Sequence, residues 1–415
     1  MLTYKEVKDI ESQFGSPFYI LDEAAFKKNY DDIVNAFAAR YEKFILAYSY
    51  KTNYIPYLCG IIMTKGGYAE VVSRIEYDLA LRIGQDPKKI IFNGPVKNYD
   101  DIELALKNES IVNLDSEYEL DYVRRYAAGN PARKVKVGLR INIDLTDENG
   151  VSHLYEGMRA GRFGFSSESD NISRIISELC RVKNLTINCL HGHSSAWDRS
   201  VWCYEKITKT LCEIASKYAP DTVEYIDIGG GIYGYIPPQM RRTQMPSFND
   251  YAKAVCGILT GNPWAKNRKP YLVLEPGVAM SANVLSYVTK VVSIKNIKGN
   301  ILVTVDGSAF HTKPTFHKVN QPHTVISKDK KENHGIYSVC GATCMEKDYL
   351  LNDIDDIVPE RGEYIKIDSV GAYTIVLTPT FIHPTPPILV RQDDHYKEIR
   401  RRQTFEDMFD CFCFE

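Results

Sequence analysis

Several features that mark a secreted, membrane-bound or nucleic-acid-binding protein are scarce in this chain. Ten cysteines in 415 residues are too few for a disulfide scaffold, and Cys411 and Cys413 have no zinc-type Cys/His pair nearby, so we expect reduced thiols and no metal. No stretch approaches the roughly 18 apolar residues of a membrane span, and the first residues lack an apolar signal core. The net charge of −2 gives no electrostatic reason to bind nucleic acid or an anionic membrane. We therefore expect a cytoplasmic protein with a small-molecule partner.

Strand-like runs recur through the first two thirds of the chain, with segments of helical periodicity between them. The runs are 44–49, 68–72, 90–92, 111–114, 135–142, 186–192, 223–228 and 271–275. Eight strand–helix units of this length predict an α/β fold, a closed (β/α)8 barrel over residues 23–282.

The alternation of strands and helices ends at about residue 282. After it come strand-like runs without long helices between them, at 284–292, 301–305, 364–367 and 372–377. We therefore predict a second, β domain made of residues 1–22 and 283–415, in which the apolar run 17–21 could pair. Residues 308–335 are rich in His, Lys, Asn and Pro, so we expect an irregular excursion there that could line a cleft.

Reactive side chains of a parallel barrel gather where its strands end, and two of these ends carry groups that could hold a phosphorylated aldehyde. Lys51 follows the first run and could carry a Schiff base, although an ordinary surface lysine is the alternative. Gly229–Gly231 follow the seventh run, where backbone N–H groups without Cβ obstruction could form a phosphate nest; a tight turn is the alternative.

Two further strand ends could hold an aromatic ring. Glu275, before Pro276 and Gly277, could hydrogen-bond a protonated ring nitrogen, and His193 could lie flat against the ring. The alternatives are a solvated loop glutamate and a hydrogen-bonded core histidine. Taken together, the four strand ends supply what pyridoxal 5′-phosphate requires, and this coenzyme acts as an electron sink once its aldehyde is joined to an amine.

From Phe14-Gly-Ser-Pro17 to residues 399–407, the chain resembles the fold-type III pyridoxal-phosphate decarboxylases, the family of diaminopimelate, ornithine and arginine decarboxylases. The resemblance implies an alanine-racemase-like TIM barrel with a C-terminal β-sandwich or β-barrel domain. It also implies a homodimer whose active sites are shared between subunits. The activity implied is decarboxylation of the α-carboxylate of an amino acid.

The resemblance also assigns roles by position. Lys51 resembles the Schiff-base lysine, and Cys344, within 341–348, resembles a catalytic cysteine that protonates the substrate carbon. The remaining cofactor contacts that it implies are Glu70 behind the ring, His193 stacked on it, Glu275 at its nitrogen with Gly277 beside it, and Ser195, Gly229, Gly230, Gly231 and Tyr373 near the phosphate.

The chain departs from the family pattern in the substrate region. Met345 stands where the family commonly has an acidic residue for the distal ammonium of a basic substrate, and Glu346 is one place further on. Lys313 stands where diaminopimelate decarboxylases often have an arginine for a substrate carboxylate, so the charge is kept without the bidentate fork. Val278 replaces an expected arginine after Gly277. These differences favour a substrate other than a classical basic diamine precursor.

Residues 378–386 are similar to part of the carrier-protein-linked glutamate decarboxylase of the butirosin pathway. With Met345, this similarity favours a specialised decarboxylase that acts on a free or carrier-linked amino acid. Three alternatives stay open: diaminopimelate decarboxylation in lysine synthesis, amino-acid racemisation, and a non-catalytic regulatory protein that binds the coenzyme.

Overall fold

The computed structural model describes residues 2–155, 158–167, 171–194, 196–241, 245–329, 332–393 and 395–414. They form two compact units: one contains the described residues within 28–234 and 244–280, and the other those within 1–27, 235–243 and 281–415. The predicted domain limits at residues 22/23 and 282/283 stay a prediction. Within the described residues, no helix has both the length and the apolar character needed to cross a membrane.

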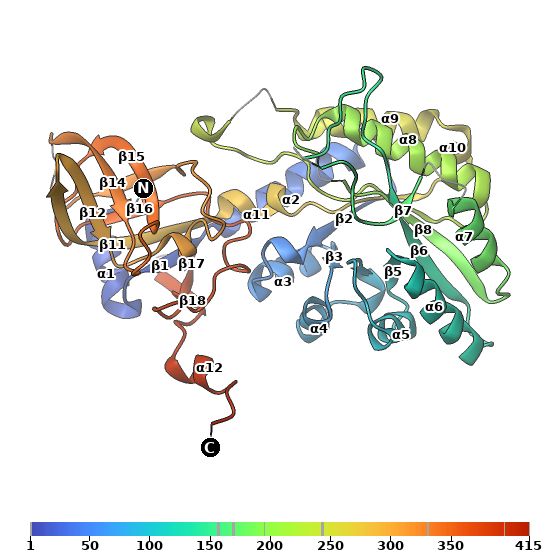
Figure 1. The fold of residues 1–415 in the computed structure, drawn as a ribbon, viewed down its shortest axis with the longest axis horizontal. Helices are drawn as coiled ribbons and strands as arrows, with labels where there is room; N and C mark the ends of the chain where they lie inside the picture. Colours follow the sequence, from blue (N-terminus) through green and yellow to red (C-terminus); the bar gives the residue numbers. More distant parts are fainter. Residues whose placement is uncertain are drawn as a thin grey trace. The chain divides into compact units, whose positions relative to one another are not determined.

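The first unit is a closed parallel barrel, as predicted (Figure 1). Strand β10 pairs with β2, and β5 pairs with β6, so the described strands close into a ring of eight. A short strand, β7 (Phe165–Ser166), pairs with β6 outside the ring. The ring strands are β2 (Phe44–Ser49), β3 (Tyr68–Val71), β4 (Ile90–Phe92), β5 (Ile111–Leu114), β6 (Val135–Asn142), β8 (Leu185–His191), β9 (Tyr225–Asp227) and β10 (Tyr271–Leu274).

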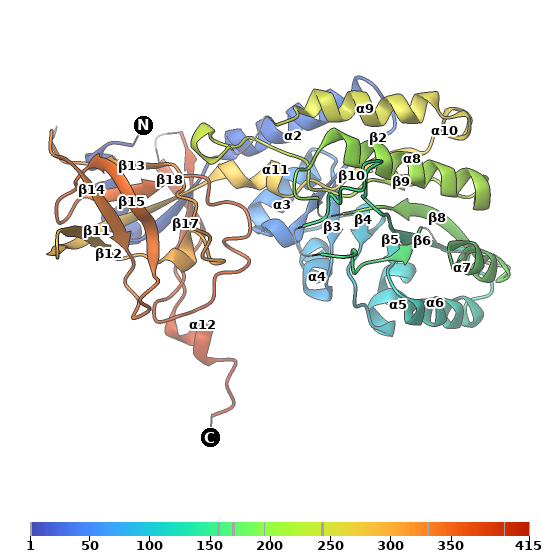
Figure 2. The same ribbon diagram turned by 45° about the horizontal axis from the view of Figure 1, so that its top comes forward.

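Helices that follow the strands surround this ring (Figure 2). Short polar side chains cap the N-termini of several of them: Ser73 accepts the backbone N–H of Glu76, and Asn98 forms a capping box with Asp101. The helices are α3 (Pro56–Thr64), α4 (Arg74–Arg82), α5 (Tyr99–Lys107), α6 (Glu117–Gly129), α7 (Asn171–Cys180), α8 (Val201–Tyr218), α9 (Phe248–Gly261) and α10 (Pro263–Arg268).

The barrel strands are apolar on both faces because helices cover the outside and side chains fill the inside. Every residue of β4 and β5 is buried. Side chains from five strands meet in one apolar cluster: Ile45, Ala47, Ile91, Ile111, Cys189 and Val273. The filled interior leaves the carboxyl ends of the strands as the place where polar side chains can converge.

The second unit is a curled mixed sheet with the order β15-β14-β12-β11-β1-β17-β18, while β16 pairs with both β11 and β13. The N-terminal strand β1 (Phe18–Leu21) pairs antiparallel with β11 (Leu285–Ile297) and parallel with β17 (Ile388–Gln392). The other strands are β12 (Asn300–Val305), β13 (His323–Ile326), β14 (His334–Cys340), β15 (Tyr349–Ile357), β16 (Tyr364–Ile367) and β18 (His395–Arg400). Helices α1 (Tyr4–Phe14) and α12 (Phe405–Phe409) belong to this unit, whereas α2 (Glu23–Ala38) and α11 (Val278–Ser281) lie where the chain passes between the units.

Two predictions about the second unit were wrong. Residues 372–377 form turns instead of a strand: Tyr373 has a left-handed φ of 59°, and the carbonyl of Thr374 accepts the N–H groups of Leu377 and Thr378. The β-branched composition of this run therefore did not decide its conformation, because tertiary contacts can override strand propensity. Strand β13 lies inside the segment 308–335 that was expected to be irregular.

Candidate active site

Lys51 lies in a short 3-10 turn, Tyr50–Thr52, directly after β2. Its Nζ is 2.5 Å from Oε2 of Glu70, a fully buried carboxylate on the neighbouring strand β3. Ser49, which pairs with Glu70 across the two strands, donates its hydroxyl to the same oxygen at 2.5 Å. The register of β2 and β3 therefore places the amine against a carboxylate.

Glu275 follows β10 on the other side of β2 and is 3% exposed. The amide of Asn93, which follows β4, donates to Oε1 of Glu275 at 2.7 Å and to Oε1 of Glu70 at 3.1 Å. Lys51 and Glu275 are therefore joined through two hydrogen-bonded side chains at the same end of the barrel.

Side chains at the ends of neighbouring strands lower the pKa of Glu275. Burial would raise the pKa of Glu275, but the nearby His191 and Lys51 outweigh it and hold that pKa well below its ordinary range. His191 Nε2 lies 3.4 Å from Oε2 of Glu275. Burial and the charge of Glu275 raise the pKa of Asp227. The site thus keeps an anion at Glu275 beside a neutral Asp227.

Larger residues would not fit at the three glycines after β9, because of close neighbours or of a left-handed backbone angle. A Cβ at Gly229, whose φ is 67°, would lie 2.5 Å from Cβ of His193, and a Cβ at Gly230 would lie 2.0 Å from the backbone oxygen of Glu275. Gly231 has a φ of 93°. This loop can therefore approach a ligand with its backbone, as a phosphate nest does.

His193 is held in its neutral form. Its Nδ1 accepts the N–H of Gly230 at 3.1 Å, which places the ring proton on Nε2. Burial, followed by the charge of Arg140, lowers the pKa of His193 to about 3. A neutral, flat imidazole therefore lies beside the glycine loop, and its stacking on a cofactor ring stays a prediction.

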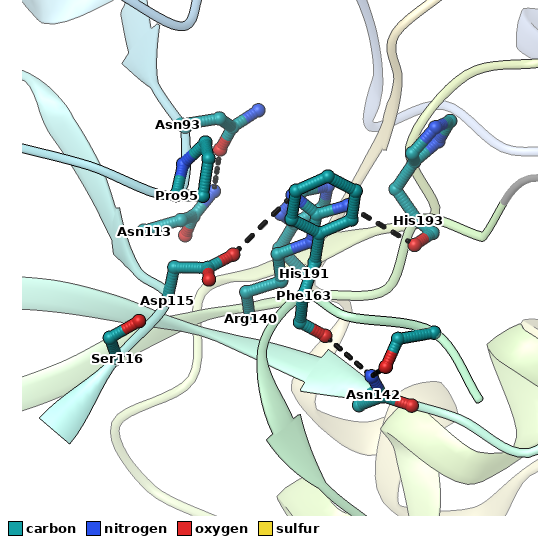
Figure 3. A network of polar contacts seen from close by, with 12 residues as sticks. Asn93, Pro95, Asn113, Asp115, Ser116, Arg140, Asn142, Phe163, His191 and His193 are labelled. Carbon is teal, nitrogen blue, oxygen red and sulfur yellow. Dashed lines mark hydrogen bonds and ion pairs between the residues drawn. The ribbon is translucent and has the colours of Figure 1, made fainter.

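Arg140, Asn93 and Asn113 were missed by the sequence analysis (Figure 3). Arg140 projects from β6, donates to the backbone oxygen of His193 at 3.3 Å and lies 3.5 Å from Oδ1 of Asp115. Its signal was an arginine between the apolar residues Leu139 and Ile141 of a predicted strand. The signal of Asn93 was its place directly after residues 90–92, a strand end that was left uninterpreted.

Two groups within the described residues have ligand atoms spaced so that they could hold a metal ion: His191, Asp227 and Glu275, and His153, Asp198 and Cys203. The expectation that the protein has no metal stays a prediction.

Gly277 packs tightly against the Lys51 turn, since a Cβ added at this position would lie 2.0 Å from Oγ1 of Thr52. Ser195 lies outside the described residues.

The remaining predicted residues belong to the β unit. Cys344 is exposed in the loop between β14 and β15, which also contains Met345 and Glu346. The buried carboxylate of Asp348 shapes this loop by accepting the hydroxyl of Thr343 at 2.6 Å.

Tyr373 is 40% exposed, with its backbone in the left-handed region. Lys313 is only 3% exposed, and burial lowers its pKa. His311 is also buried, with its Nδ1 2.9 Å from the hydroxyl of Tyr287.

The barrel residues fit pyridoxal phosphate on three structural grounds. The amine of Lys51 is accompanied by a carboxylate, Glu275 is a buried anion, and the glycine loop has no room for side chains. In addition, Nδ1 of His191 is buried next to Glu275 without a hydrogen-bond partner among the described residues. Buried polar groups without partners are rare and commonly mark a functional site.

Comparison with known proteins agrees with this geometry. The family model described as "Pyridoxal-dependent decarboxylase, pyridoxal binding domain" matches residues 24–282. Diaminopimelate decarboxylase from Aquifex aeolicus is 25% identical, with 96% of this chain and 92% of the relative covered; that from Haemophilus influenzae is 26% identical, with 97% and 94% covered.

Among solved structures, diaminopimelate decarboxylase from M. jannaschii in complex with L-lysine has a TM-score of 0.87 at 23% identity, covering 99% of this chain and 94% of that one. Lysine/ornithine decarboxylase from Vibrio vulnificus in complex with putrescine has a TM-score of 0.73 at 20% identity, covering 91% and 96%. These structures support the fold. Because the family model covers more than half of the chain, the protein belongs to the pyridoxal-dependent decarboxylases, carboxy-lyases whose cofactor is pyridoxal phosphate.

Proposed function

We propose that this protein removes the α-carboxylate of diaminopimelate, or of a closely similar amino acid, with pyridoxal phosphate as its cofactor. The observation that carries the proposed chemistry is the hydrogen-bonded series of Lys51, Glu70, Asn93 and Glu275 at the end of the barrel. The substrate rests on near-full-length similarity to diaminopimelate decarboxylases. That similarity supports the diaminopimelate alternative better than the specialised-metabolism interpretation, which depended on Met345 and residues 378–386.

In this proposal, the barrel residues hold the cofactor. Nζ of Lys51 is its point of covalent attachment, Glu275 holds its ring nitrogen, and neutral His193 lies against the ring. The backbone N–H groups of Gly229–Gly231 take the phosphate. When bound, the cofactor supplies an electron-poor ring that accepts the electron pair released as CO2 leaves.

The protein side chains then control charge and protons. Glu275, whose low pKa keeps it anionic, favours a protonated ring nitrogen. Glu70 keeps the amine of Lys51 oriented, because three donors, from Ser49, Lys51 and Asn93, fix its carboxylate. An amine held in this way meets the aldehyde of the cofactor without a search for its position.

The β unit would complete the substrate site. We infer that Cys344 returns a proton to the substrate carbon, and that Tyr373 contacts the phosphate. Diaminopimelate carries both an ammonium and a carboxylate at its distal end, which Glu346 and Lys313 could match in charge. A homodimer with shared active sites would bring Cys344 to the barrel of the partner subunit.

A substrate panel tests the proposal. Cofactor-loaded protein is incubated with meso-diaminopimelate, lysine, ornithine, arginine, glutamate and carrier-linked glutamate, while CO2 release and product chirality are measured. We expect CO2 and lysine from diaminopimelate. Carrier-linked glutamate as the only substrate would restore the specialised interpretation, inversion without CO2 would show a racemase, and cofactor binding without turnover would show a regulatory protein.

A further inference from the structure

The side-chain amide of Asn93 lies between two buried carboxylates that have different tasks in the proposed function. Asn93 is 2% exposed, Glu70 0% and Glu275 3%. Nδ2 of Asn93 lies 3.1 Å from Oε1 of Glu70 and 2.7 Å from Oε1 of Glu275, so its two hydrogens are divided between the two carboxylates. One amide therefore contacts both the partner of the amine and the proposed partner of the ring nitrogen.

A hydrogen bond from Asn113 fixes the orientation of this amide on the side away from the two carboxyl groups. Oδ1 of Asn93 accepts a hydrogen bond from Nδ2 of Asn113 at 2.8 Å, which settles which end of the Asn93 side chain faces the carboxylates (Figure 3). Asn113 in turn lies opposite Gly138 on β6, where a Cβ would come within 1.8 Å of its Oδ1. A glycine at 138 thus makes room for the side chain that orients Asn93.

An amide is the side chain that this position requires. A carboxylate at 93 would place a further negative charge against two buried carboxyl groups, and an apolar side chain would remove a donor from each. A hydroxyl could donate to only one of them. The position demands two donated hydrogens and no charge.

We propose that Asn93 is a positioning residue that couples the two ends of the cofactor site, because its amide donates to both Glu70 and Glu275 and so holds the two carboxyl groups in fixed relation. The inference rests on the proposed function only in requiring that the cofactor attaches to Lys51. Asn93 itself neither reacts with the substrate nor carries a proton in the reaction.

The test compares Asn93→Ala, Asn93→Asp and Asn93→Ser with the wild type. The matched control is Asn184→Ala: Asn184 precedes β8, at the far end of the strand, and donates its amide to three backbone carbonyls. Three readouts are used: the pH midpoint of the visible absorption of the Lys51-linked cofactor, the cofactor dissociation constant, and turnover. Thermal unfolding separates these effects from a general loss of stability.

In Asn93→Asp, we expect the added negative charge to raise the absorption midpoint by about one pH unit or more. In Asn93→Ala, cofactor binding should weaken by roughly tenfold, because two buried carboxylates lose a donor. Asn93→Ser should fall between Ala and the wild type, and Asn184→Ala should leave both readouts unchanged. If Asn93→Ala does not fold, the Ser and Asp variants decide the question.

The inference fails if the Asn93 variants keep the wild-type midpoint and a dissociation constant within about twofold, or if Asn184→Ala changes both equally. The proposed function fails separately, if the wild-type protein does not attach the cofactor at Lys51. The two failures are therefore distinguishable in the same set of spectra.

Discussion

Glu76 should make the stability of the barrel depend on pH near neutrality. It lies in the first turn of α4, is 7% exposed, and its Oε2 accepts the N–H of Val72 at 2.8 Å. Burial raises the pKa of Glu76 from the ordinary 4.5 to about 7, and the negative charge of Glu70 adds to this effect, whereas Lys51 opposes it. Folding therefore favours the protonated form.

The sign and size of the effect follow from linkage. Between pH 4.5 and about 7 the folded protein binds more protons at Glu76 than the unfolded chain does, so the free energy of unfolding falls as pH rises through this window. A tenfold difference in proton affinity between the folded and unfolded states corresponds to about 1.4 kcal/mol. The rise in the pKa of Glu76 from 4.5 to about 7 therefore sets an upper bound of about 3 kcal/mol on the change in the free energy of unfolding. The helix N-terminus favours the charged form, so we expect about 1–3 kcal/mol.

Glu76→Gln tests this reasoning, because glutamine keeps an oxygen acceptor for the N–H of Val72 but does not ionise. Urea unfolding of both proteins at pH 5, 6, 7 and 8 should show the variant gaining stability over the wild type as pH rises. The exposed Glu213→Gln is the control and should show no such trend. A difference between wild type and Glu76→Gln that is the same at all four pH values would refute the argument.

Two further substitutions test the site. Gly230→Ala should weaken cofactor binding by roughly 5-fold to 150-fold, because the new methyl group would displace the backbone of Glu275 at a cost of about 1–3 kcal/mol. The control is Gly257→Ala, where a Cβ meets no atom within 4 Å, and this variant should bind the cofactor normally in titration calorimetry. Cys344→Ala should lower the rate of decarboxylation at least about 100-fold while the absorption spectrum of the cofactor is unchanged. Substitution of another exposed cysteine, Cys180→Ala, should alter neither the rate nor the spectrum. Normal turnover in Cys344→Ala would contradict the assignment of Cys344 as the proton donor.

The barrel could be predicted because its strands are buried on both faces and therefore read as apolar runs at regular intervals. Runs such as 90–92, 111–114 and 135–142 coincide with β4, β5 and β6. Parallel strands also bring their carboxyl ends together, so reading the strand ends was enough to predict that Lys51 and Glu275 lie at the same end of the barrel.

Other features depend on contacts that no local pattern records. Asn93 and Glu275 are 182 residues apart, and their hydrogen bond exists only because the barrel closes. Residues 372–377 have the composition of a strand, yet the turn at Thr374 decides their conformation. Lys313 and His311 lie in a polar segment, and their burial follows from tertiary packing that this segment does not reveal.

The central claim is that the amine of Lys51 and the carboxylate of Glu275 act on one bound cofactor. The most direct measurement is borohydride reduction of the cofactor-loaded protein, followed by peptide mass spectrometry, on the wild type and on Glu275→Gln. We expect the pyridoxyl group on Lys51 in both proteins, with a shifted absorption spectrum and weaker binding in Glu275→Gln. Label on a different lysine, or an unchanged spectrum and affinity in Glu275→Gln, would contradict the claim.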